Sequence, residues 1–126
     1  MQIFHPVLTY EDAHGAIEFL ERAFGFERKE VHEGDNGGVA HAELGFAGEV
    51  VGLSSVSEGD PSFNQGTGRT TVYVVTEDPD SVFARASDAG AEVVMEPTDQ
   101  DYGSRDFAVR DPEGNVWAFG TYNPGA

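Results

Sequence analysis

The sequence contains no cysteine, and this absence excludes disulfide bonds, thiolate metal ligands and a cysteine nucleophile. It also has no apolar run long enough to cross a membrane. Residues 1–6 lack the basic and apolar regions of a signal peptide. These absences predict a cytoplasmic protein.

Basic side chains are scarce as well. Seven Lys and Arg residues stand against 23 Asp and Glu residues, which gives a net charge of −16, and Lys29 is the only lysine. A field of this sign repels phosphate backbones and anionic lipid, so we expect neither nucleic acid nor membrane as a partner. The same field favours a cationic ligand, although solubility is a sufficient reason for it.

An internal repeat is the most informative pattern that is present. Asp12 opens a helical pattern of apolar residues, and Asp78 opens another 66 residues later. The same offset places Gly48-Glu49-Val50-Val51-Gly52 under Gly114-Asn115-Val116-Trp117-Ala118. A chain of 126 residues has the length of one domain, so two half-length modules must share one core.

Each half of the chain shows the same order of elements, which predicts an α+β fold of two βαβββ modules in tandem. Module one covers about residues 3–54, module two covers about residues 70–122, and a polar linker at 55–69 joins them. In module one we expect a strand at 3–10, a helix from Asp12 to Gly25, and strands at 27–32, 39–44 and 49–54. In module two we expect a strand at 70–75, a helix after Asp78, and strands at 92–95, 106–110 and 115–121.

Several motifs resemble a known superfamily. They are the early His5 followed by Asp12, the segment Phe19-Leu20-Glu21-Arg22-Ala23-Phe24-Gly25-Phe26, and the turn Arg110-Asp111-Pro112-Glu113-Gly114-Asn115. Together with the paired modules they resemble the vicinal-oxygen-chelate superfamily of glyoxalases, extradiol dioxygenases and bleomycin-resistance proteins. This resemblance implies curved mixed sheets that form a cup. It also implies a homodimer whose sites lie where sheets of two modules meet, often across the subunit boundary.

The resemblance further implies where a metal would be bound. Metal-dependent members take ligands from the first and last strands of each module, and the matching positions here are His5, Gly52, Thr71 and Ala118. Three of these four side chains lack a strong ligand atom for zinc, nickel or iron. We therefore predict no metal in the usual position and no cofactor.

A substitute site is still conceivable in module one. Strand alternation places His41 and Glu43 on one face beside Gly52, and His5 can look into the same concavity. These three side chains could hold a non-standard metal, or His41 and Glu43 could form an acid–base pair. They could equally be ordinary polar residues in a wet groove.

Module two supplies further candidates. A four-residue turn at 111–114 would pair Phe107 with Ala118 and direct Phe107 and Arg105 into the cup, with Tyr73 and Tyr102 beside them. Arg105 could grip an anionic group or form an ion pair with Asp106 or Asp111. Trp117 and Phe119 would face the helices as core residues. The candidate ligand-binding residues are His5, His41, Glu43, Tyr73, Tyr102, Arg105 and Phe107.

Two functions from different classes follow from these patterns. The first is a protein that binds and sequesters a cationic or neutral small molecule in a metal-free cup, similar to bleomycin-resistance proteins. The second is a lyase or isomerase that uses a non-standard metal or an acid–base pair from His5, His41 and Glu43. The sequence does not identify the ligand or decide whether the protein is an enzyme.

Overall fold

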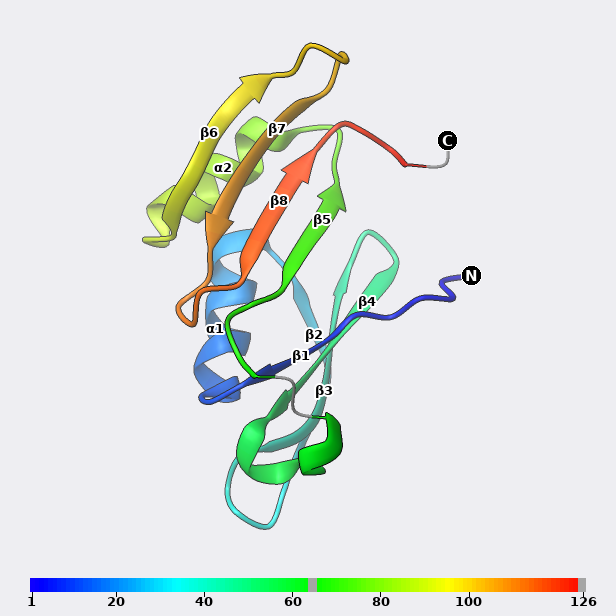
Figure 1. Cartoon of the computed structure of the whole chain (residues 1–126), viewed down its shortest axis with the longest axis vertical. Coiled ribbons are helices and arrows are strands. Elements are labelled where there is room, and N and C mark those ends of the chain that lie inside the picture. Colours follow the sequence, from blue (N-terminus) through cyan, green and yellow to red (C-terminus); the bar gives the residue numbers. More distant parts are fainter. Residues whose placement is uncertain (64–65, 125–126) are drawn as a thin grey trace.

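The computed structural model describes residues 1–63 and 66–124, and their elements follow the predicted order (Figure 1). Module one comprises β1 (Val7–Tyr10), α1 (Ala13–Phe24), β2 (Glu27–Glu33), β3 (Val39–Phe46) and β4 (Glu49–Ser55). Module two comprises β5 (Thr71–Val75), α2 (Pro79–Asp88), β6 (Glu92–Asp99), β7 (Arg105–Arg110) and β8 (Val116–Gly120). Short 3₁₀ turns at Val56–Glu58 and Pro61–Phe63 lie between the modules. No helix in the described ranges is long and apolar enough to cross a membrane.

The two modules have the same topology, which confirms the predicted fold class. The described strands form two sheets, ordered β1-β4-β3-β2 and β5-β8-β7-β6, in which the first strand runs parallel to the last. Val7 lies opposite Gly52 in one sheet, and Tyr73 lies opposite Ala118 in the other, so both partners keep the 66-residue offset. Asp12 and Asp78 accept a hydrogen bond from the backbone N–H three residues later and cap their helices.

Two strand boundaries differ from the prediction by four residues, and the others agree within two. The first strand begins at Val7 rather than at residue 3, because the side chain of Gln2 takes the place of strand pairing. Its amide accepts a bond from Val50 N at 2.7 Å and donates one to Val50 O at 3.0 Å. Strand β6 continues to Asp99, four residues past its predicted end, because two irregularities in register keep it paired with β7.

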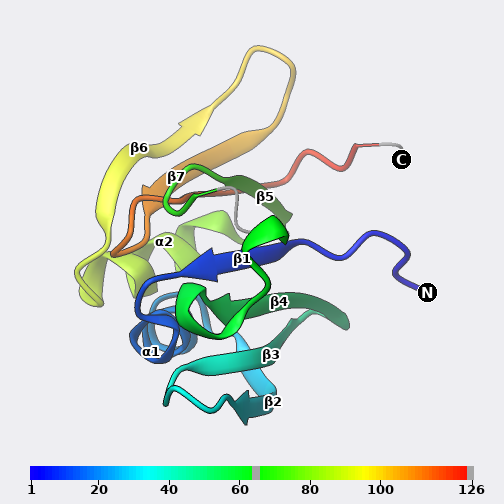
Figure 2. The same ribbon diagram turned by 60° about the horizontal axis from the view of Figure 1, so that its bottom comes forward.

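One core of aromatic and aliphatic side chains joins the modules. Each helix covers one side of its own sheet, and α1 packs against α2 (Figure 2). Phe24 at the end of α1 lies 4.7 Å from Phe119 and 5.6 Å from Trp117, measured between ring centroids, and both of those rings belong to β8. Trp117 and Phe119 are buried, as predicted. Burial of these rings stabilises both modules at once.

Polar contacts between the modules reinforce this core. The carboxylate of Glu113 accepts bonds from Glu11 N and Asp12 N, each at 2.8 Å, so the β7–β8 turn is docked on the start of α1. At the other end of α1, Arg85 of α2 donates to Arg22 O at 2.9 Å and Glu21 O at 3.2 Å. Arg22 O receives the guanidinium in place of a helical N–H, whereas Glu21 O also accepts a bond from Gly25 N. The positive charge of Arg85 therefore stabilises the C-terminal end of α1.

Candidate functional site

Each sheet has a helix side and an open face. The helix sides of both sheets contribute to the shared core, so the two open faces lie on the sides away from it. Figure 2 shows α1 and α2 between the sheets, which is why the open faces of one chain do not cover each other. A site on an open face is therefore exposed to solvent in the single chain.

The register of β7 and β8 corrects two of the predicted site residues. The connection has five residues, from Asp111 to Asn115, and pairs Phe107 with Phe119 rather than with Ala118. A slip of one residue moves every side chain of a strand to the other face. Phe107 is consequently 0% exposed and stacks on Phe119 at 5.2 Å in the core.

Arg105 alternates with Phe107 and lies on the same helix side. It donates to Asp80 at the start of α2 at 2.9 Å and to Asp99 at 3.2 Å. These hydrogen bonds raise the pKa of the guanidinium. Arg105 therefore forms ion pairs, but with Asp80 and Asp99 rather than with the predicted Asp106 or Asp111. On the helix side it cannot contact a ligand bound to the open face.

The open face of module one is lined by charged side chains. His41 lies 2.8 Å from Glu43 on β3, as the sequence predicted, and Glu43 faces Gly52. On the neighbouring strand β2, His32 lies 3.0 Å from Glu30. The register brings Glu30 opposite Glu43 and His32 opposite His41. Because the His41–Glu43 arrangement recurs in an adjacent pair, it is best described as charge pairing along a strand surface.

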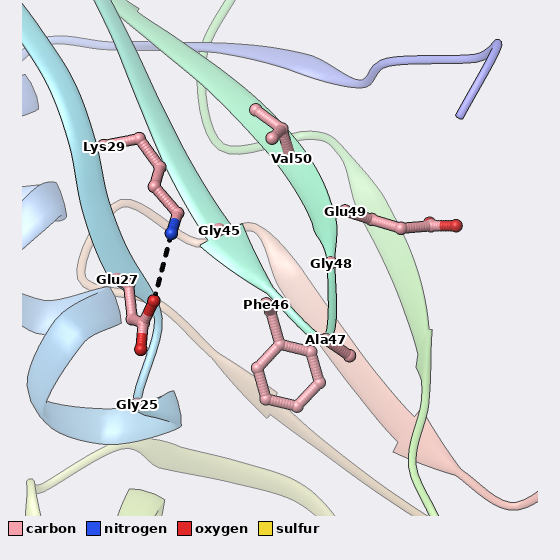
Figure 3. Close-up of a pocket in the computed structure, with 9 residues that line it drawn as sticks. All are labelled: Gly25, Glu27, Lys29, Gly45, Phe46, Ala47, Gly48, Glu49 and Val50. Carbon is pink, nitrogen blue, oxygen red and sulfur yellow. Dashed lines mark hydrogen bonds and ion pairs between the residues drawn. The ribbon is translucent and has the colours of Figure 1, made fainter. Parts of the chain in front are cut away.

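A cavity of about 560 Å³ lies at the end of this face (Figure 3). Lys29 reaches over Gly45 and bonds Glu27 at 3.1 Å. A Cβ on Gly45 would lie only 2.6 Å from Lys29 Cε, so glycine leaves the room that the lysine occupies. The tight β3–β4 turn uses Ala47 at φ 52° and Gly48 at φ 84°, the positive φ pair of a two-residue hairpin.

The residues present do not fit the metal site of the superfamily resemblance. Val7, not His5, lies opposite Gly52, and Tyr73, not Thr71, lies opposite Ala118. In the described ranges, no group of three or more His, Cys, Asp or Glu side chains is arranged to hold a metal ion. This also removes the geometric basis for a substitute centre from His5, His41 and Glu43.

The open face of module two has a different character. Its floor consists of small residues on β7 and β8, namely Ala108, Ala118 and Gly120. The side chain of Tyr73 crosses β8 above Gly120 and donates to Asp106 Oδ1 at 3.0 Å. A Cβ on Gly120 would collide with Asp106 Oδ1 and would lie 2.5 Å from Tyr73 Oη, so this contact requires glycine.

Tyr102 reaches the same carboxylate from the β6–β7 loop. Its hydroxyl donates to Asp106 Oδ2 at 3.1 Å, while Ser104 Oγ donates to Asp106 Oδ1 at 2.5 Å. The hydrogen bond to Asp106 raises the pKa of Tyr102. Burial raises the pKa of Tyr73, and its bond to Asp106 adds to the effect. Tyr73 and Tyr102, two of the predicted candidates, thus lie close together. The residue that joins them is Asp106, which was not among the candidates.

Asp106 and Tyr122 were missed as site residues. Asp106 was considered only as an ion-pair partner, because the predicted register turned it toward the helices. Tyr122 follows β8, and its backbone N–H donates to Tyr73 Oη at 3.1 Å while its ring meets Tyr102 edge-on at 5.9 Å. The local signal that could have found it is the spacing of aromatics after the last strand, but only the fold brings the three tyrosines together.

A second cavity, of about 470 Å³, lies where the start of the chain and the β3–β4 hairpin approach β5. Its wall is mostly apolar and includes Phe4, Phe46, Val50, Val72 and Val75. Phe4 is 89% exposed, so this groove leaves apolar surface in contact with water in the single chain. Neither this groove nor the cavity beside Lys29 was predicted from the sequence.

The predicted site residues therefore divide into three groups. His41 and Glu43 lie on the open face of module one, and Tyr73 and Tyr102 lie on that of module two. Phe107 and Arg105 lie on the helix side of module two. His5 is exposed in the segment that precedes β1.

Comparison with known proteins agrees with this architecture. The sequence model of the Glyoxalase/Bleomycin resistance protein/Dioxygenase superfamily matches residues 2–119. The chain belongs to this superfamily.

Three individual proteins illustrate this similarity. The crystal structure of TioX from Micromonospora sp. ML1 is 30% identical, covers 98% of this chain and 100% of its own, and has a TM-score of 0.84. The uncharacterized protein Rv0887c of Mycobacterium tuberculosis is 34% identical over 91% of this chain and 71% of its own length. A glyoxalase/bleomycin resistance protein from Streptomyces sp. CB03234 shares the fold, with a TM-score of 0.72 at 22% identity over 91% of this chain and 96% of its own.

Proposed function

We propose that this protein binds and sequesters a cationic or neutral small molecule on the open faces of its sheets, without a metal. The observation that carries the proposal is the open face of module two, where a floor of Ala108, Ala118 and Gly120 is bordered by Tyr73 and Tyr102. A surface of small residues with aromatic walls and few polar groups is typical of a ligand site. Membership of a superfamily that includes bleomycin-resistance proteins supports the same function.

The charged face of module one supports a role in orientation rather than in chemistry. Its histidines and acids are paired with each other, and its family metal positions include Gly52, which has no side chain. An enzyme of this superfamily that stabilises charge with a metal would need ligands that these positions lack. Binding without turnover therefore accounts for the geometry with fewer assumptions.

We further propose that two copies of the chain form the complete site. In the described sheets, β1 and β5 are edge strands. Thr76 N and Thr70 O form hydrogen bonds on the β8 side of β5. Backbone groups alternate in direction along a strand, so the N–H and C=O groups of Tyr73 and Val75 point to the free edge. Ile3, Phe4 and Val7 are large apolar residues that remain exposed. A second copy would cover these groups and bring an open face of module one against one of module two.

The dimer is testable by light scattering coupled to gel filtration at micromolar concentration. We expect a mass of twice 13.5 kDa for the parent protein. Changing Val7 or Val75 to Glu should shift it toward the monomer, because a charge on this surface would be buried unpaired. Val94→Glu is the matched control, since Val94 is similarly exposed but lies on β6 at the opposite edge. A monomeric parent protein would contradict the proposal.

Ligand binding is testable by thermal shift with a panel of cationic, neutral and anionic aromatic compounds that includes bleomycin. We expect stabilisation by cationic or neutral members, because a ligand that binds only the folded state raises its melting temperature. Ala118→Leu should abolish the shift by filling the floor of module two, and Glu43→Gln should weaken it for cations.

Arg105→Ala serves as the matched control for this experiment. Arg105 lies on the helix side and pairs with Asp80 and Asp99, so its removal should leave the ligand response of the folded protein unchanged. Loss of binding in Arg105→Ala together with retention in Ala118→Leu would place the ligand elsewhere and contradict the proposed site.

A further inference from the structure

The tyrosine cluster of module two contains a charge that the fold does not neutralise. The carboxylate of Asp106 is 5% exposed and accepts bonds from the hydroxyls of Tyr73, Tyr102 and Ser104. Among the residues that the structure describes, no Lys, Arg or His forms an ion pair with it. The adjacent Arg105 points to the other side of the sheet. A buried carboxylate without a cationic partner favours the approach of a cation from the open side.

The rings around this carboxylate are also suited to a cation. Tyr102 is 67% exposed and Tyr122 is 51% exposed, and their rings stand nearly perpendicular, at 78°. An ammonium group placed over such rings is attracted by the negative face of each π system within about 6 Å of the ring centroid. The hydroxyls of Tyr73 and Tyr102 donate to a carboxylate, which increases the electron density of both rings.

Three separate segments supply this arrangement, and hydrogen bonds of the fold hold each of them in place. Tyr73 comes from β5, Tyr102 from the β6–β7 loop and Tyr122 from the segment after β8. Gly120 gives Tyr73 the space to cross β8, and Tyr122 N–H fixes the Tyr73 hydroxyl at 3.1 Å. The rings are therefore positioned before any ligand binds, which lowers the entropic cost of binding.

We propose that Tyr73, Tyr102, Tyr122 and Asp106 form a subsite for a positively charged alkylammonium group of the ligand. This inference rests on the proposed function, because it assigns one part of the binding surface to one chemical class. It goes beyond that function by separating the two modules: module two binds the cationic group, and the charged pairs of module one contact the remainder. The net charge of −16 increases the local concentration of such ligands near the subsite.

The test is a titration of the ¹⁵N-labelled parent protein with tetramethylammonium chloride, followed by NMR at constant ionic strength. We expect saturable shifts of the Tyr102 and Tyr122 amide signals, with a dissociation constant on the order of 10 mM for so small a probe. tert-Butyl alcohol, a neutral compound of similar size, should give no saturable shift at these signals. Equal responses to the two compounds, or shifts that follow sodium chloride alone, would overturn the subsite.

Variants separate the roles of ring and charge. Tyr102→Leu should weaken tetramethylammonium binding by about fivefold, while Tyr102→Phe retains the ring and should weaken it less. Asp106→Asn keeps the size of the side chain and should weaken binding by a similar factor. The matched controls are Phe63→Leu, an exposed ring on another surface, and Asp88→Asn, an exposed acid on α2; both should bind as the parent does. Unchanged binding in Tyr102→Leu would refute the subsite.

The two proposals can fail separately. If aromatic compounds still stabilise the parent protein and not Ala118→Leu, while tetramethylammonium gives no saturable shift, the subsite is wrong and the binding function stands. If tetramethylammonium saturates at Tyr102 and Tyr122 but no compound of the panel stabilises the protein, the cluster binds cations while the proposed sequestering function fails.

Discussion

Asp111→Ala should lower the free energy of unfolding by about 3–5 kcal/mol, one of the two largest effects that we expect. The buried carboxylate of Asp111 accepts bonds from Tyr10 Oη at 2.6 Å and Trp117 Nε1 at 3.1 Å. It also accepts bonds from Asn115 Nδ2, Asn115 N and Glu113 N. Removal of the acceptor leaves buried donors of both modules unpaired, and each costs about 1–3 kcal/mol. Urea unfolding followed by circular dichroism measures the change.

Asp35→Ala is the control for this measurement, because Asp35 is an exposed acid in a turn and its removal should change stability by less than about 0.5 kcal/mol. Tyr10→Phe is the companion variant, since it removes one donor and keeps the ring. It should cost about 1.5–3 kcal/mol at neutral pH. A loss below 1 kcal/mol for Asp111→Ala would show that water replaces these contacts and that the buried network does not join the modules.

The companion variant also has a pH signature. Burial raises the pKa of the Tyr10 hydroxyl above its ordinary value of 10.0, and the charge of Asp111 raises it further. The folded state therefore keeps a proton that the unfolded chain loses above about pH 10, so stability is retained below this pH and declines above it. Above about pH 10, the difference in free energy of unfolding between the parent protein and Tyr10→Phe should decrease by about 1.4 kcal/mol per pH unit. Other tyrosines are common to both proteins and cancel in the difference.

Phe24→Ala should destabilise the protein by about 3–5 kcal/mol, because a buried ring is lost and a cavity remains. Phe24 is 2% exposed and contacts Phe19 and Phe26 of its own module, and Trp117 and Phe119 of the other. Since it lies between the modules, we also expect the unfolding transition to lose cooperativity. Calorimetry measures both effects.

Phe63→Ala is the matched control for this ring deletion, because Phe63 is 80% exposed and its loss leaves no cavity. A Phe24→Ala protein that unfolds in one transition at nearly the parent temperature would contradict the single shared core. Two separate transitions in the parent protein itself would contradict it as well.

The order of elements could be predicted because it depends on local patterns. The caps at Asp12 and Asp78 and the apolar spacing of each helix are properties of neighbouring residues, and they were found where predicted. Burial of Trp117 and Phe119 followed from simple alternation along β8. The faces of the module-one hairpin were also predicted, although its register was not. The predicted four-residue turn at 45–48 is a two-residue turn, which pairs Glu43 with Gly52 instead of Val50. A shift of two residues keeps every side chain on its predicted face.

The amino-acid sequence by itself determined the repeat, the two βαβββ modules and the family. Only the tertiary structure decided the register of β7 and β8, because the five-residue turn depends on Asp111, whose carboxylate is held by Tyr10 from a strand 101 residues away. That single-residue difference placed Phe107 in the core and turned Asp106 toward the tyrosines. Alternation assigns residues to two faces, but long-range hydrogen bonding decides which of the two faces is open.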